Sequence, residues 1–169
     1  MDDVEISTLG GGAIGKVADW LKVPAVSESF IPRFPETAEE LKDYFLQPGR
    51  VYFQVAFQGE VVGVIGGENV DAPSGKMEMR KLVGDRRHRG KGIGKRATFL
   101  FLHHAFDVLG TNKVYLHTSN INIRNINLNS RFGFQLEGIF FEDHLGGGQR
   151  QDVMRMALLK RDWERIFPR

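Results

Sequence analysis

The sequence predicts a mixed α/β fold in which helices cover a sheet. Apolar residues recur at helical spacing in some segments and alternate at strand spacing in others, and turn residues separate these segments. The chain has 169 residues, of which 41% are hydrophobic, which is enough for one core and too little for two. We therefore expect a single domain over residues 1–169.

The first 46 residues predict a short strand and two helices. Val4–Leu9 is strand-like, and apolar side chains follow helical spacing from Ile14 to Leu21. Thr37 and Glu40 have the spacing of a capping box, which opens a second helix that we expect to end near Phe45.

The rest of the chain alternates between strands and helices. Val51–Phe57 and Val61–Ile65 flank turn residues and predict a hairpin. The further predicted elements are a strand at Lys76–Val83, a helix at Gly92–Leu109, a strand at Val114–Thr118, a helix at Ile123–Arg131, and strands at Phe134–Glu142 and Asp152–Leu158.

Composition excludes several classes of chemistry. The absence of cysteine rules out disulfides, thiolate zinc sites and a cysteine acyl-enzyme. The N-terminus lacks the features of a secretory signal, and no apolar run could span a bilayer, so we expect a cytoplasmic protein without a membrane partner. His103 and His104 are expected to pack structurally, and His88 and His144 to lie on exposed loops. No zinc-ligand spacing is present, so no metal site is expected.

The positive charge is concentrated between Arg80 and Arg96, where eight Lys or Arg residues face the single acid Asp85. This segment runs from a predicted strand into a predicted helix and carries glycines at 90, 92 and 94. Glycine backbone can approach an anion closely, and the free amides of a helix N-terminus favour phosphate. A solvated basic loop and a nucleic-acid site are the alternatives. The latter lacks aromatic stacking residues, so nucleic-acid binding is not expected.

Other phosphate-binding motifs fit less well. The glycine spacing does not match the dinucleotide fingerprint. The segment Gly10–Lys16 comes close to a Walker A sequence, but Val17 stands where a magnesium-binding hydroxyl is needed. We interpret Gly10–Lys16 as a glycine-rich entry to a helix.

Three segments in order resemble the GNAT superfamily of N-acetyltransferases. Arg89-x-x-Gly92-x-Gly94 is similar to the element with which that family binds the pyrophosphate of coenzyme A. Residues 122–134, Asn-Ile-Arg-Asn-Ile-Asn-Leu-Asn-Ser-Arg-Phe-Gly-Phe, are similar to the family's N-x-R-A-I-x-L-Y-E-K-x-G-F. A third segment from Glu137 to Trp163 resembles the branch with ribosomal-protein, spermidine and amino-sugar acetyltransferases.

The resemblance implies a GNAT fold: a mixed, mostly antiparallel sheet with splayed central parallel strands and helices on both faces. It also implies acetyl-CoA as co-substrate, a homodimer, and an amine acceptor read by loops such as Val23–Pro35. The implied coenzyme-binding residues are Leu82, Val83, Arg87, Arg89, Gly90, Lys91, Gly92, Ile93, Gly94, Lys95, Asn122, Asn129 and Arg131.

Direct attack of an amine on a thioester requires a base, because an alkylammonium with a pKa near 10 must first lose a proton. His117 lies on the second central strand, at the place of the catalytic Glu in ribosomal-protein N-terminal acetyltransferases. Histidine titrates near neutral pH, which suits this role. Glu78, on the first central strand, is the second candidate, and its alternative role is to pair with Arg80.

One position departs from the family. Asn129 stands where the family carries the Tyr that protonates the departing thiolate, and an amide cannot release a proton. The thiolate would leave with a hydrogen bond from Asn129, or be protonated through water, Tyr115 or Ser130. This departure keeps open a second hypothesis, a non-catalytic acyl-CoA-binding or sensor protein.

Overall fold

The computed structural model describes residues 3–23, 26, 34–35, 37–119 and 121–168. The strands are β1 Val4–Thr8, β2 Val51–Phe57, β3 Glu60–Asp71, β4 Lys76–Val83, β5 Lys113–Ser119, β6 Gln135–Gly146 and β7 Gln149–Leu159. The helices are α1 Gly11–Leu21, α3 Ala38–Leu46, α4 Ile93–His103, α5 Ile123–Ser130 and α6 Lys160–Ile166, with a 3₁₀ turn η1 Arg86–His88 and a π-helical turn η2 His104–Val108.

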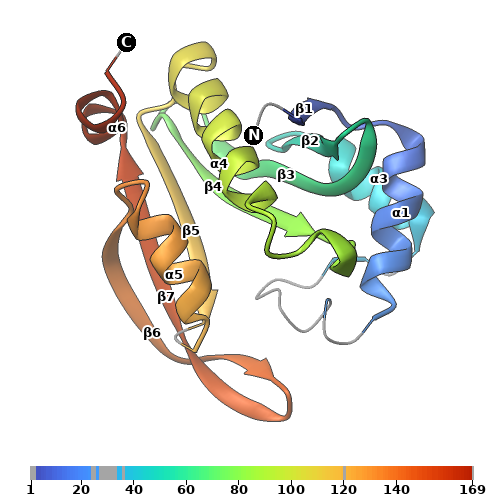
Figure 1. The fold of residues 1–169 in the computed structure, drawn as a ribbon. Coiled ribbons are helices and arrows are strands. Elements are labelled where there is room, and N and C mark those ends of the chain that lie inside the picture. Colours follow the sequence, from blue (N-terminus) through green and yellow to red (C-terminus); the bar gives the residue numbers. More distant parts are fainter. Residues whose placement is uncertain (1–2, 24–25, 27–33, 36, 120, 169) are drawn as a thin grey trace.

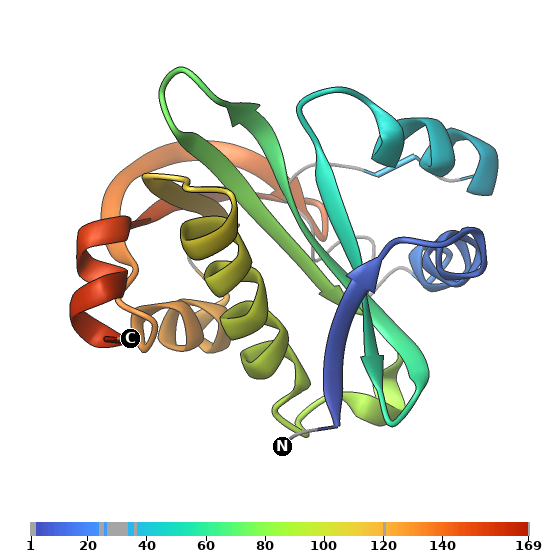
Figure 2. The same cartoon turned by 90° about the horizontal axis from the view of Figure 1, so that it is seen from above.

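The strands form one sheet in the order β1-β2-β3-β4-β5-β7-β6. Every neighbouring pair is antiparallel except β4 and β5, which are parallel. Figure 2 shows α1 and α3 on one side of the strands and α4 on the other. The predicted fold class, a mixed and mostly antiparallel sheet with helices on both faces, is therefore confirmed.

A hydrophobic core lies on each side of the sheet. Phe101 and Phe106 pack with Met77 and Met79 of β4 on the α4 side. On the α1 and α3 side, Val17 and Leu41 pack with residues of the opposite strand face, among them Leu82. Because side chains alternate along a strand, β4 supplies odd-numbered residues to one core and even-numbered residues to the other face.

Local sequence signals account for several element ends. Thr37 and Glu40 form the predicted capping box, with the Glu40 amide donating to Thr37 Oγ1 at 3.2 Å and the Thr37 amide donating to Glu40 Oε2 at 3.4 Å. The helix predicted at Gly92–Leu109 is observed as α4 followed by η2, and Gly110 ends it with φ +68°.

The structure differs from the sequence-based prediction at several element ends. Strand β6 continues to Gly146, beyond the predicted Glu142, and β7 begins at Gln149, before the predicted Asp152. Helix α1 begins at Gly11, three positions before the predicted start at Ile14. Strand β3 continues to Asp71, beyond the predicted Ile65. Helix α6 was not predicted, and its buried Trp163 stacks on Phe106. Most of the segment Val23–Pro35, expected to read the acceptor, lies outside the described residues.

No helix among the described residues is both long enough and apolar enough to cross a bilayer.

Candidate active site

The two parallel strands separate partway along their length. Pairing between β4 and β5 runs from Lys76 with Lys113 to Glu78 with Tyr115. Beyond that point β4 stays paired with β3, and β5 stays paired with β7, so both inner edges are open. Figure 1 shows the two strands diverging. A cavity of about 810 Å³ occupies this region and is lined by β4, β5, α5 and the start of α4.

The open edge of β4 offers backbone amides to the cavity. The Gly84 amide donates to Val62 O of β3 at 3.0 Å. Because amide direction alternates along a strand, the Leu82 amide also faces β3, whereas the amides of Lys81 and Val83 face the gap. Leu82 and Val83 were both expected to bind the coenzyme, and of these two only Val83 directs its backbone amide toward the cavity.

A glycine-rich turn leads from β4 into α4. Gly92 caps the helix with φ 80°, a left-handed conformation that glycine adopts without strain. The helix hydrogen bonds begin with the Arg96 amide on Gly92 O, so the preceding first-turn amides point outward at the cavity. Arg89 Nε donates to Val83 O at 3.3 Å, and Lys95 lines the cavity. This helix end combines free donors with positive charge and can bind a pyrophosphate.

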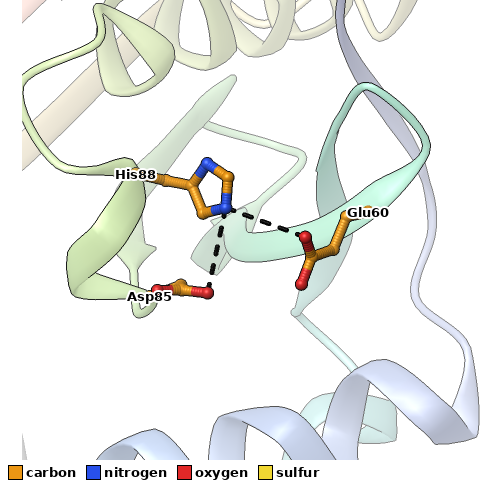
Figure 3. Close-up of side chains that lie close together, drawn as sticks. All are labelled: Glu60, Asp85 and His88. Carbon is orange, nitrogen blue, oxygen red and sulfur yellow. Dashed lines mark ion pairs between the residues drawn. The ribbon is translucent and has the colours of Figure 1, made fainter.

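An ion-pair cluster fixes the segment before this turn. His88 Nε2 lies 3.7 Å from Glu60 Oε2 and 3.9 Å from Asp85 Oδ2 (Figure 3). The Arg87 guanidinium contacts both oxygens of Asp85, with the shortest distance 2.6 Å, and this hydrogen bonding lowers the pKa of Asp85 to about 2. Since Arg87 already holds the carboxylate, we interpret the cluster as a clamp between the β2–β3 hairpin and η1. The expectation that His88 is an exposed loop residue was wrong, because its side chain is 13% exposed and packs on Phe57.

Helix α5 forms the opposite wall of the cavity. Asn122 caps it by accepting from the Asn125 amide at 3.2 Å, and Asn125 Nδ2 donates to Thr118 Oγ1 of β5 at 3.2 Å. Asn122 and Arg131 both line the cavity.

Asn129, in the last turn of α5, is fully buried and hydrogen-bonded to a lysine. Its Oδ1 accepts from Lys81 Nζ at 2.9 Å, and the same amine donates to Thr98 Oγ1 at 3.1 Å. Lys81 is partly exposed at the cavity wall, but its amine is surrounded by protein, and this desolvation lowers the pKa of Lys81 to about 7. Lys81 was not among the residues expected at the site. The one sequence signal for Lys81 is that a charged residue alternates with Met79 and Val83 on the strand face that points into the core.

The two candidate bases contact each other. Glu78 is the last residue of β4 that pairs with β5, opposite Tyr115, and His117 lies two residues further along β5. His117 Nδ1 lies 3.1 Å from Glu78 Oε1. Burial alone would raise the pKa of Glu78, but the hydrogen bond from His117 and the charge of Arg80 outweigh it and lower the pKa below its ordinary value. An ionised carboxylate only accepts hydrogen bonds, so Nδ1 of His117 carries a hydrogen and Nε2 of the neutral ring keeps a lone pair.

Glu78 also belongs to a polar network on the α1 and α3 side. Asn69 Nδ2 donates to Glu78 Oε2 at 2.9 Å, and Arg80 Nε lies 3.5 Å from Glu78 Oε1. Arg80 further pairs with buried Glu68 at 2.7 Å, and Glu68 accepts from the hydroxyls of Tyr44 and Tyr52. The network thus holds Glu78 through Asn69 and Arg80, while the His117 ring packs edge-on against Tyr115 and Phe140.

Most residues expected at the site gather around this cavity. Those that line it are Glu78, Leu82, Val83, Arg89, Gly90, Gly92, Ile93, Gly94, Lys95, His117, Asn122 and Arg131. Arg87, Lys91 and Asn129 are not part of its lining. Arg80, Lys81 and Asn125 line it but were missed, because contacts made across the sheet leave no local sequence pattern.

The upstream glycine-rich segment has a different environment. Lys16 Nζ donates to Val61 O at 3.1 Å and lies 3.9 Å from Glu60. These contacts support a structural interpretation of Gly10–Lys16.

Comparison with known proteins finds acetyltransferases, both as a matching family and as individual relatives. Residues 16–134 match the Acetyltransferase (GNAT) family. Spermidine N(1)-acetyltransferase of Vibrio cholerae is 34% identical over 73 residues, which are 43% of this chain and 42% of that protein. Spermine/spermidine N(1)-acetyltransferase of Bacillus subtilis is 27% identical over 112 residues, 65% of this chain and 74% of that protein.

The fold is also shared with a solved structure. The crystal structure of spermidine N-acetyltransferase from Vibrio cholerae in complex with CoA and spermine matches with a TM-score of 0.89. The match covers 96% of this chain and 99% of that chain at 21% identity, which is evidence for the fold.

Proposed function

The chain belongs to the GNAT acetyltransferase family, and we propose that it transfers the acetyl group of acetyl-CoA to a primary amine by direct attack. The observation that carries this proposal is the gap between β4 and β5, where free backbone donors, a cationic helix N-terminus and the Glu78–His117 pair meet in one cavity.

Coenzyme A is expected to enter along the open edge of β4. The first-turn amides of α4, with Arg89 and Lys95, suit its pyrophosphate. The gap-facing amide of Val83 suits the pantetheine arm, and another gap-facing amide, that of Lys81, is available as a donor to the thioester oxygen. Asn122 and Arg131 would complete the site from the α5 side.

His117 is the proposed base, and Glu78 its positioning residue. Glu78 accepts from Nδ1 and so directs the lone pair of Nε2 away from itself, toward the acceptor. When His117 takes a proton from the acceptor ammonium, the ionised Glu78 stabilises the imidazolium. The freed amine then attacks the thioester carbon, the C–S bond breaks, and an amide and coenzyme A thiol result.

The acceptor belongs to the class of primary amines found in protein N-termini, polyamines and amino sugars. The names of the relatives favour polyamines. A polyamine site needs acidic side chains, and here Glu68 and Glu78 are both paired with Arg80. We therefore propose the amine class and leave the individual acceptor to experiment. In keeping with the resemblance, we also propose a cytoplasmic homodimer.

The test is a thiol-release assay with acetyl-CoA and a panel containing spermidine, an amino sugar and a peptide with a free N-terminus. At least one amine should give turnover, and mass spectrometry should show a single added acetyl group. Coenzyme A binding without turnover of any amine would overturn the enzymatic proposal. It would establish the non-catalytic acyl-CoA-binding protein that Asn129 suggests.

A further inference from the structure

The departing thiolate needs a proton, and Asn129 cannot supply one. The structure places an amine at this position instead: Lys81 Nζ donates to Asn129 Oδ1 at 2.9 Å and to Thr98 Oγ1 at 3.1 Å. Asn129 occupies the place of the family's proton-donating Tyr. Its hydrogen-bond partner Lys81, on β4, therefore puts a titratable amine next to that place.

The surroundings of Lys81 are unusual for a structural lysine. It points to the α4 side of the sheet, between Met79 in the core and Val83 packed against it. Both of its hydrogen-bond partners are neutral, and within the described ranges no carboxylate lies within ion-pair distance of its amine. A lysine retained for stability would pair with an acid, because an unpaired buried charge costs free energy.

We propose that Lys81 is the general acid of the reaction and that Asn129 is its positioning residue. This inference rests on the proposed function. As the tetrahedral intermediate collapses, the C–S bond breaks with its electron pair moving to sulfur, and a proton moves from Lys81 Nζ to that sulfur. The neutral amine then regains a proton from solvent. In the overall reaction the acceptor ammonium loses two protons. One is equivalent to the proton gained by the thiol, and the other is released to solvent.

The titration of Lys81 suits this role. Desolvation lowers its pKa to about 7, close to that of a thiol at about 8.5, so proton transfer is nearly balanced in energy. Thr98 of α4 and Asn129 of α5 face the amine, Lys95 and Arg131 line the same cavity, and His117 and Glu78 point to the other side of the sheet. Because the acid must be protonated, kcat should fall as pH rises through the pKa of Lys81.

The experiment is Lys81→Met, assayed with the acceptor found in the panel. Methionine keeps the length of the side chain and suits an apolar strand face, so the variant should fold. The rate kcat should fall about 10²- to 10³-fold, the alkaline decline of the pH profile should disappear, and the Kd of coenzyme A should change less than about threefold. Lys76→Met, on the same strand but outside the cavity, is the matched control and should keep its rate.

Restoration provides the second arm. In the Lys81→Met background, Asn129→Tyr supplies the hydroxyl that the family uses, and kcat of this double variant should be at least about tenfold higher than that of Lys81→Met alone. A Lys81→Met enzyme with kcat within threefold of wild type would overturn the proposal. So would a double variant that binds coenzyme A but recovers nothing. Failure of the proposed function is distinguishable, because then the wild type itself gives no turnover.

Discussion

Replacing each member of the Glu78–His117 pair separates the base from its positioning residue. His117→Ala removes the lone pair that accepts the proton, and general-base catalysis is worth about 10²- to 10⁴-fold, so kcat/KM should fall by that factor, or about 2.7–5.5 kcal/mol. The loss should be in rate, because His117 contributes mainly to the transition state, and the Kd of coenzyme A should stay nearly unchanged.

Glu78→Gln should have a smaller effect. It keeps the shape of the side chain but replaces a charge-assisted hydrogen bond of about 1.5–3 kcal/mol by a neutral bond of about 0.5–1.5 kcal/mol. The difference of about 1–1.5 kcal/mol corresponds to a decrease of roughly 5- to 15-fold in kcat/KM. Since Glu78 lies 3.1 Å from His117, the two effects should not add in the double variant.

The assay is initial-rate thiol release between pH 6 and 9, with melting temperature as the control for folding. His117→Ala should also lose the ascending limb of the pH-rate profile. If Glu78→Gln lowered kcat/KM more than a hundredfold while His117→Ala lowered it less than tenfold, Glu78 would be the base. If neither changed the rate threefold, proton removal would fall to solvent or the acceptor.

Acetyl-CoA at about a hundred times Kd should add about 2.7 kcal/mol to the free energy of unfolding and raise the melting temperature by roughly 5–11 °C; no shift at millimolar ligand would refute coenzyme binding. Gly92→Val should abolish that shift, because it forces a β-branched residue to φ 80° and puts a side chain beside the phosphate-facing amides. Lys16→Ala should preserve the shift. If calorimetry gave the reverse pattern, the coenzyme would bind at Gly10–Lys16 and not at the loop around Gly92. Glu78, whose pKa is lowered in the fold, contributes stability that is present above its unfolded pKa of about 4.3 and is lost as pH falls below it, so urea unfolding of Glu78→Gln should show a weaker loss between about pH 5 and 3 than wild type.

The sequence alone determined the features that depend on neighbours along the chain. The Thr37–Glu40 capping box and the helix that starts after Gly92 are local, because their hydrogen bonds and dihedral angles involve residues a few positions apart. The bounds of β4 were predictable because turn residues flank the strand, although its hydrogen-bond partners lie far away in the sequence. The proposed coenzyme loop is local in the same sense. Its glycines and cations are contiguous, so their spacing already indicated a strand-to-helix turn able to hold a phosphate.

Tertiary structure decided which side chains meet. His117 and Glu78 were separate candidates in the sequence, and different roles could be proposed for them only because the neighbouring parallel strands β4 and β5 bring them within 3.1 Å. Lys81 and Asn129 are 48 positions apart, and no periodicity couples them. The lowered pKa of Lys81 has the same origin, since desolvation depends on everything packed around the amine. The sequence thus indicated the candidate phosphate-binding loop, while strand register and burial arranged the proposed proton-transfer groups.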